Sequence, residues 1–158
     1  MTKLKLSFLI ILFISNCLTA FSQTEKTIDS LERQHQTCLD KGEYMLGCSK
    51  KFYFQIDSLL NIQYKKLREK CDNTQKANLK DDQIKWLAAR DKQFKYNRQH
   101  VHKEAKESGF EGGQDEIMIL TDKNSMFVRD RVVELLNKLP NNYSANKYKG
   151  KTYKVSTE

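Results

Sequence analysis

The sequence predicts an all-α protein, a small bundle of three long helices that follow a short N-terminal helix or ordered lead-in. Apolar side chains recur every three or four residues along three long stretches, which is the spacing of one helix face. No stretch alternates apolar and polar residues over the length of a strand. The only proline, Pro140, and a glycine-rich segment at 108–113 fall where these stretches end.

Residues 1–22 have the features of a secretory signal peptide. Lysines near the start precede a run from residue 6 to 14 that is apolar apart from Ser7, and small residues at positions 20 and 22 offer a cleavage site. The apolar run is shorter than the roughly 20 residues that a membrane-spanning helix needs. We therefore predict a periplasmic or secreted protein. Lipidation at Cys17 and a retained N-terminal helix are the alternatives.

The charge distribution argues against a nucleic-acid binder. The net charge of +8 falls to +6 without Lys3 and Lys5, and half of that excess lies in residues 141–158. This Lys-, Asn- and Tyr-rich segment indicates a disordered basic tail after a domain at 23–140. In the rest of the chain acidic residues interleave with basic ones, which is typical of solvated helix faces.

Beyond the leader the chain has three cysteines, Cys38, Cys48 and Cys71. An exported protein meets an oxidising compartment, so at least one disulfide and one remaining thiol are expected. We favour a Cys38–Cys48 bridge because it encloses the turn-like segment 40–43. Cys71 is then either a buried free thiol or the site of an intermolecular bridge.

The first two long helices each carry polar residues beside their apolar stripe. The first, at residues 44–72, carries Asp57, and the second, which continues to about residue 107, carries Trp86 and Arg90. A guanidinium that is packed against an apolar core needs a hydrogen-bond acceptor, because an unpaired buried charge strongly destabilises the folded state. We predict that these two helices pack antiparallel, with Asp57 facing Arg90.

The third long helix extends from about residue 114 to 139. Its core face is apolar apart from Asn124. Pro140 ends the folded body, since proline cannot continue a helix.

No arrangement of residues indicates catalysis or a metal site. His100 and His102 are two apart, so on a helix they point about 200° apart and cannot share a metal. Asp81 and Asp82 could be imagined as paired acids, but they fit better as first-turn carboxylates that favour the helix dipole. No Ser or Cys nucleophile lies near a His in the sequence, and the glycines form no phosphate-binding loop. We expect neither an enzyme nor a cofactor.

A series of spaced motifs extends from about residue 38 to 139. The pattern is Cys-x9-Cys, then D-x2-LN-x2-Y-x2-L, Q-x2-W-x3-RD, a Gly-Gly turn and R-x3-L. The matching positions are Cys38, Cys48, Asp57, Leu60, Asn61, Tyr64, Leu67, Gln83, Trp86, Arg90, Asp91, Gly112, Gly113, Arg131 and Leu135. This series resembles the lysozyme inhibitor LprI-like N-terminal domain family.

The resemblance implies a small, exported, helical bacterial protein that inhibits lysozyme, so a lysozyme or another envelope protein is the expected partner. The polar motif residues fall between helices, and we interpret them as a buried network that fixes helix register: Asp57, Asn61, Tyr64, Gln83, Trp86, Arg90 and Asp91. A binding surface would then be sought in an exposed loop, for which the candidate is Ser108, Gly109, Phe110, Glu111, Gly112 and Gly113.

Two features depart from the family pattern. Phe94 stands where family members tend to carry a cysteine, and no cysteine follows Cys71, so a second disulfide is lost. The positive charge also opposes the steering that would help an inhibitor reach a strongly basic host lysozyme. The alternative is therefore a non-inhibitory envelope module whose basic tail contacts anionic lipid or glycan.

Overall fold

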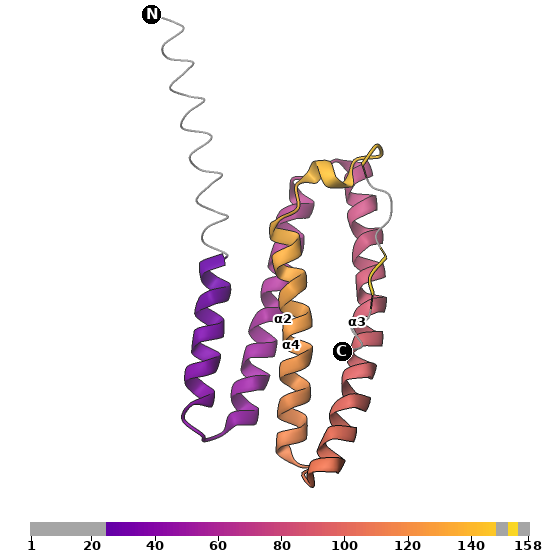
Figure 1. The fold of residues 1–158 in the computed structure, drawn as a ribbon. Helices are drawn as coiled ribbons and strands as arrows, with labels where there is room; N and C mark the ends of the chain where they lie inside the picture. The colour runs from indigo at the N-terminus through magenta and orange to yellow at the C-terminus, as the bar shows by residue number, and fades with distance from the viewer. Residues whose placement is uncertain (1–24, 148–151, 155–158) are drawn as a thin grey trace, which may run out of the picture.

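The computed structural model describes residues 25–147 and 152–154, and these form an elongated bundle of helices (Figure 1). A helix over residues 25–39 is followed by α2 (Met45–Glu69), α3 (Asn73–Ser108) and α4 (Gln114–Leu136). A 3-10 helix, η1, then covers Pro140–Tyr143. Successive helices run in opposite directions, and the described residues contain only helices, turns and irregular chain. The all-α prediction is confirmed.

The N-terminal helix is a full member of the bundle rather than a short lead-in. Its described part, residues 25–39, lies along α2 (Figure 1). Ile28 of this helix is only 2% exposed and belongs to the central core. The predicted signal peptide and the alternative lipidation site at Cys17 lie outside the described residues.

Of the two later long helices, α4 and not α3 is the partner of α2, so the prediction that α2 packs on the Trp86 helix is wrong. Among α2, α3 and α4, the contact between α2 and α4 is the most extensive, whereas α2 and α3 touch only briefly. Figure 1 shows α4 between α2 and α3. The reason is the apolar face of α4, where Val128 and Val132 are fully buried. Periodicity predicts that a face is buried, but it does not say against which helix.

One continuous apolar cluster holds the bundle together. The ring of Trp86 on α3 stacks on Phe127 of α4 at 5.9 Å between ring centroids. The fully or nearly buried members come from every helix and are Ile28, Phe52, Ile56, Leu59, Leu60, Leu67, Cys71, Leu79, Trp86, Val128, Val132, Leu135 and Tyr143.

The long helix α3 starts earlier than the sequence suggested. Asp72 caps it, because its carboxylate accepts from the backbone N–H of Gln75 at 2.8 Å while the Gln75 side chain accepts from the Asp72 N–H at 2.9 Å. The helix then continues for 36 residues, about 54 Å, to Gly109, whose φ of 78° ends it. Asp81 and Asp82 therefore lie well inside α3, and their interpretation as first-turn carboxylates is wrong.

The cysteines behave as predicted. Cys38 and Cys48 form a disulfide that joins the N-terminal helix to the first turn of α2. Cys71 is a buried free thiol, the first of the two alternatives. Its Sγ–H donates to the carbonyl of Leu67 at 3.2 Å. Burial, followed by the charge of Asp72, raises the pKa of this thiol, so little reactive thiolate forms.

The segment predicted to be a disordered tail from residue 141 is partly packed onto the bundle. Tyr143, in η1, is 1% exposed, and Asn78 on α3 donates to its carbonyl at 2.7 Å. Tyr153 packs against the core from residues 152–154. The polar composition of the segment predicted disorder, but the burial of two tyrosines is enough to hold part of it on the bundle.

None of the helices that the structure describes is both long and apolar enough to span a membrane.

Removing the disulfide should lower the stability of the bundle without changing its fold. The bridge closes a short ring of sequence separation 10, so the Cys38→Ser/Cys48→Ser variant should lose about 2–3 kcal/mol of unfolding free energy. Urea denaturation measures the loss. Dithiothreitol should destabilise the wild type by a similar amount and leave the variant unchanged. Equal dithiothreitol sensitivity of both proteins would contradict the prediction.

Candidate functional site

A buried ion pair between α3 and α4 lies at the centre of the most elaborate polar cluster. Arg131 Nη2 donates to Asp82 Oδ2 at 2.8 Å, and the two side chains are 0% and 1% exposed. The Arg131 guanidinium also donates to Gln83 Oε1 at 2.9 and 3.2 Å and to Glu134 Oε2 at 2.8 Å. These hydrogen bonds supply the partners without which a buried charge pair would be strongly destabilising.

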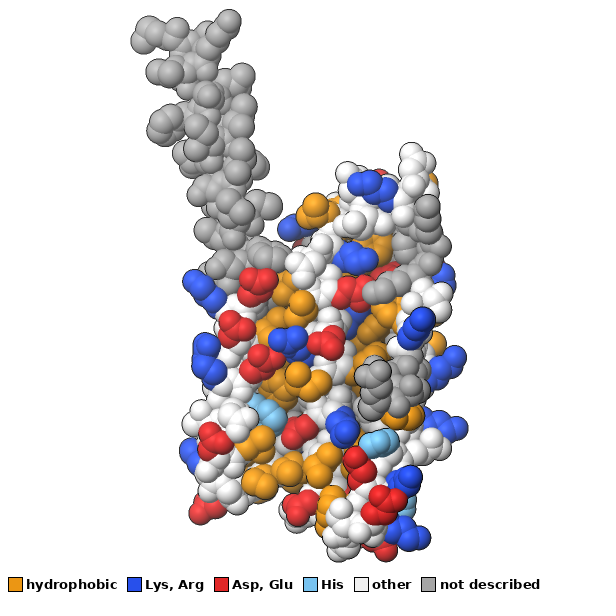
Figure 2. All heavy atoms as spheres, in the orientation of Figure 1, with side chains coloured by type: hydrophobic (Ala, Val, Ile, Leu, Met, Phe, Trp, Pro, Cys, Tyr) orange, Lys and Arg blue, Asp and Glu red, His pale blue; other side chains and the backbone are white. Residues whose placement is uncertain are grey.

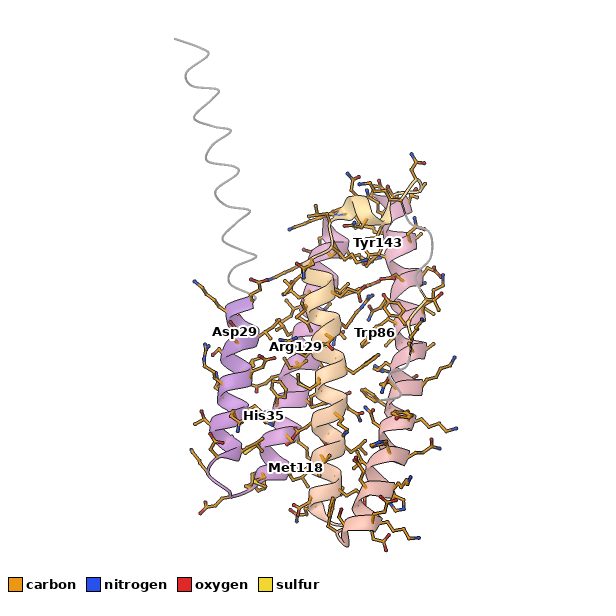
Figure 3. The ribbon with its side chains drawn as sticks, in the orientation of Figure 1. Asp29, His35, Trp86, Met118, Arg129 and Tyr143 are labelled. Carbon is orange, nitrogen blue, oxygen red and sulfur yellow. A yellow bond between two sulfur atoms is a disulfide. The ribbon has the colours of Figure 1, made fainter. Side chains whose placement is uncertain are left out.

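Two tyrosines from the C-terminal segment complete this cluster. Tyr143 donates to Asp82 Oδ2 at 3.1 Å, and Tyr153 donates to Asp82 Oδ1 at 2.9 Å. Arg131 Nη1 donates to the Tyr153 hydroxyl. Figure 3 shows Tyr143 at the end of the bundle near the start of α3, with Trp86 further along α3. The C-terminal segment therefore seals the ion pair from solvent.

The electrostatics keep each group in the state that its hydrogen bonds require. Burial is the largest single influence on the pKa of Arg131 and lowers it, but the surrounding groups, with the Asp82 carboxylate first among them and the hydrogen bond to Glu134 included, together outweigh burial and raise the pKa. Burial, together with the charge of Asp82, raises the pKa of Tyr143 and Tyr153, so both hydroxyls stay protonated and donate. The Arg131 guanidinium also lies 5.6 Å from the Trp86 ring centroid, which adds a cation–π contact. A cluster this closed holds helices together and offers no surface to a partner.

The structure separates the polar residues that were predicted to form one network. Gln83 and Trp86 do belong to the buried cluster. Arg90 does not pair with Asp57: it donates to its neighbour Asp91 at 3.0 and 2.8 Å and is 27% exposed. Its guanidinium lies 5.8 Å from the rings of both Trp86 and Phe94. The predicted Asp57–Arg90 pair is therefore wrong.

The two remaining motif residues lie on α2. Asn61 is exposed and donates to the carbonyl of Asp57, one turn earlier in the same helix, at 3.0 Å. Tyr64 is partly buried and packs against the apolar core. Among the described residues, neither side chain forms a hydrogen bond with α3, because α4 occupies the space between α2 and α3.

Residues missed by the sequence analysis could have been found from helical spacing. Arg131 lies three residues after Val128 and four before Leu135, and Asp82 lies three after Leu79 and four before Trp86. Both are therefore on core faces. Tyr143 and Tyr153 carried no comparable signal, because no periodicity extends beyond Pro140.

A second polar chain crosses from α3 to α4. Gln93 Nε2 donates to Asn97 Oδ1 at 2.9 Å, and Asn97 Nδ2 donates to Asn124 Oδ1 at 2.9 Å. This contact explains why Asn124 interrupts the apolar face of α4.

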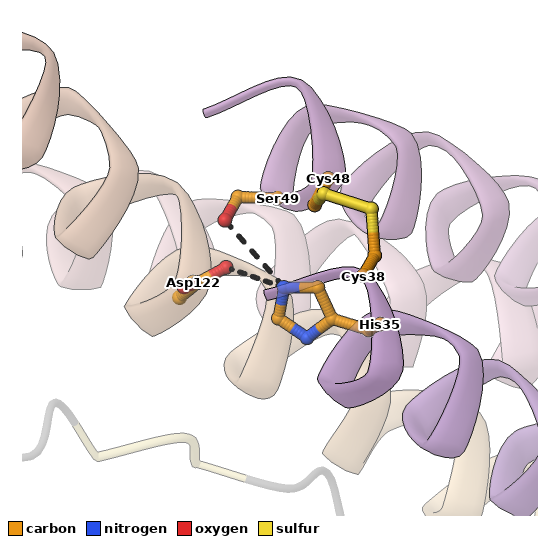
Figure 4. The surroundings of a disulfide bond; sticks show 5 residues. All are labelled: His35, Cys38, Cys48, Ser49 and Asp122. Carbon is orange, nitrogen blue, oxygen red and sulfur yellow. Dashed lines mark hydrogen bonds and ion pairs between the residues drawn. A yellow bond between two sulfur atoms is a disulfide. The ribbon is translucent and has the colours of Figure 1, made fainter. Parts of the chain in front are cut away.

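Figure 4 shows a third polar contact beside the disulfide, where the N-terminal helix meets α2 and α4. The His35 ring stacks on Phe52 at 4.5 Å between centroids. Its Nε2 lies 3.3 Å from Asp122 Oδ1 on α4 and 3.5 Å from Ser49 Oγ on α2. Arg129 of α4 also donates to Glu32 of the N-terminal helix at 2.8 Å. These contacts bind the N-terminal helix to the bundle.

The predicted binding loop is an exposed and well-ordered turn between α3 and α4. Gly109 and Gly112 have positive φ angles of 78° and 72°. Glu116 accepts from the Gly112 N–H at 2.6 Å and lies 3.0 Å from His102 Nδ1. The Gly112 hydrogen bond, with a smaller contribution from His102, lowers the pKa of Glu116 below its ordinary value of 4.5.

Open surfaces of the described chain offer little for a small ligand. An open groove of about 390 Å³ lies between the N-terminal helix and α2 and is lined by Ser30, Arg33, Gln34, Thr37, Cys38, Lys41 and Lys51. Residues 25–147 and 152–154 contain no cluster of His, Cys, Asp or Glu suited to a metal ion. On the face seen in Figure 2, acidic and basic side chains are intermixed.

Comparison with known proteins gives one match. A family model described as Lysozyme inhibitor LprI matches residues 34–135, which include the disulfide, the whole of α2 and α3, and Arg131. Tyr143 and Tyr153 lie beyond the matched range. Comparisons with curated proteins and with solved structures gave no match.

Arg131→Ala should destabilise the protein far more than Arg90→Ala. Loss of Arg131 leaves Asp82 buried without its charge partner, which typically costs about 3–5 kcal/mol. Loss of the partly exposed Arg90 should cost about 0–1 kcal/mol. Urea denaturation of the two variants provides a matched comparison. Equal losses would mean that the Asp82–Arg131 pair does not carry the stability assigned to it.

Glu116 should stabilise the α3–α4 turn in a pH-dependent way. Its pKa is lower in the folded than in the unfolded protein, so its stabilisation is present above the ordinary value of 4.5 and is lost as the pH falls through the folded value. The stability difference between wild type and Glu116→Gln should therefore be constant near neutral pH and shrink on acidification. A difference that does not change with pH would contradict this assignment.

Proposed function

Because the chain belongs to the lysozyme inhibitor LprI family, we propose that it is an exported protein that inhibits a lysozyme-type muramidase by binding it directly. Family membership is the observation that carries this proposal. The Cys38–Cys48 disulfide supports export, since such bridges persist mainly in oxidising compartments.

A rigid bundle suits inhibition by occlusion. A binder that is already in its bound shape loses less conformational entropy on association, which favours tight binding. Here the disulfide fastens one end of the bundle, and the Asp82–Arg131 pair fastens α3 to α4 nearer the other. The buried polar residues are therefore assigned to the scaffold and the exposed turns to the target.

We place the inhibitory surface at the end of the bundle that carries the α3–α4 turn. Ser108–Gly113 is exposed or partly exposed throughout, and its conformation is held by the Gly112–Glu116 hydrogen bond. The turn between the N-terminal helix and α2 lies at this same end (Figure 1). A short turn forms a narrower projection than a helix face, which suits entry into a cleft.

The charge of the protein narrows the choice of target. Muramidases cleave with a pair of carboxyl groups in the cleft. A chain whose net charge is +6 without Lys3 and Lys5 is better matched to an enzyme of acidic surface than to a strongly basic one. Bacterial or host muramidases with acidic surfaces are therefore the preferred targets.

The alternative, an envelope module that uses its basic tail, has weaker support. Tyr143 and Tyr153 are turned into the Asp82–Arg131 cluster, which leaves mainly lysines for a contact with lipid or glycan. Deleting the tail would also expose the ion pair and destabilise the fold. Substitution of Lys147 and Lys154 by Gln tests tail binding without that complication.

Purified, oxidised protein spanning residues 23–158 should inhibit at least one muramidase in a panel that contains acidic and basic enzymes. Inhibition should approach one-to-one stoichiometry and should be strongest for an acidic enzyme. Turbidity loss of a cell-wall suspension measures the activity. Unchanged activity of every enzyme at a hundredfold molar excess of the protein would overturn the proposed function.

A further inference from the structure

The turn that joins the N-terminal helix to α2 holds an exposed aromatic side chain in an unfavourable backbone conformation. Among the described residues, Tyr44 is the only non-glycine with a positive φ, at 53°, and its side chain is 87% exposed. From this turn we infer that Tyr44 is the residue that enters the substrate cleft of the target muramidase. The inference rests on the proposed function and identifies its contact residue.

The residues that the structure describes provide little side-chain packing to offset the conformation of Tyr44. A bulky residue in the left-handed region is strained, and such strain is retained mainly where function requires it. A buried tyrosine could offset the strain through packing, but Tyr44 has most of its surface in solvent. Asn or Gly would fit this position better if the turn served only to connect two helices.

The backbone of Tyr44 is held by its surroundings. Gly47 and Cys48 both donate their backbone N–H to the Tyr44 carbonyl, at 2.9 and 3.2 Å. Cys48 is in turn tied to Cys38 by the disulfide. The ring lies against Gly47, where an added Cβ would come within 1.9 Å of a ring carbon. An exposed tyrosine on a fixed backbone is the kind of anchor that contributes most to protein interfaces.

The groove beside the turn carries the charge that such a target would attract. Arg33, Lys41 and Lys51 line it, and none of these cations forms an ion pair with another described residue. A muramidase cleft contains carboxylates and binds sugar rings. The aromatic ring of Tyr44 suits a subsite that binds a sugar ring. The cations of the groove suit the carboxylates of the cleft.

The position of the turn also permits entry. It lies at the end of the bundle that also carries the α3–α4 turn, away from η1 (Figure 1).

Tyr44→Gly separates binding from stability. Glycine adopts a positive φ without strain, so this variant should keep or raise the melting temperature. Its inhibition constant should nevertheless rise at least about tenfold, as for loss of an aromatic anchor. The enzyme used is the panel member that the wild type inhibits most strongly. Inhibition equal to wild type, with the fold intact, would overturn the inference while leaving the proposed function standing.

Two further variants complete the experiment. Phe54→Ala removes another exposed aromatic, 72% exposed on α2, and should leave inhibition unchanged. Gly47→Ala keeps Tyr44 but displaces its ring, so inhibition should weaken. If Phe54→Ala weakened inhibition as much as Tyr44→Gly, exposed apolar area in general would be responsible and the inference would fail. If the wild type inhibited no enzyme of the panel, the proposed function would fail, and the inference with it.

Discussion

The ion pair between Asp82 and Arg131 is the interaction on which the arrangement of α3, α4 and the C-terminal segment depends. Both side chains are sealed from solvent, so each requires the other and the hydrogen bonds around them. Gln83, Glu134, Tyr143 and Tyr153 supply those bonds. A displacement of any of these segments would leave a buried charge without partners. The pair therefore specifies which helices are neighbours and in which register, even if apolar residues could have stabilised the bundle equally well.

The buried cluster and the proposed contact surface occupy different ends of the molecule. The cluster lies toward the end that holds η1, whereas the disulfide and both exposed turns lie at the opposite end (Figure 1). The long helices connect the two ends, because α3 alone extends over about 54 Å. This separation directs the search for contacts with a target to Tyr44 and its neighbours.

Helical spacing from Trp86 does not distinguish two adjacent faces of α3. Gln83, Arg90 and Phe94 lie on one of them, and the structure buries the other, which carries Asp82, Ala89 and Gln93. Residues one apart on a helix differ by about 100°, so both choices satisfy a three-to-four spacing from Trp86. Hydrophobicity favoured Phe94 over Gln93. The buried face is polar there because Gln93 and Asn97 meet Asn124 of α4.

The sequence by itself determined the helical class, the Cys38–Cys48 disulfide and the family, because these depend on local periodicity, loop length and motif spacing. Only the tertiary structure decided that α4 separates α2 from α3, that Arg131 and not Arg90 is the buried arginine, and that the C-terminal tyrosines belong to the core. An apolar helix face can pack against any other apolar helix face, because the hydrophobic effect is not directional. Only the joint requirement of filling space and pairing Asp82 with Arg131 selects the arrangement, and that requirement involves residues 49 positions apart.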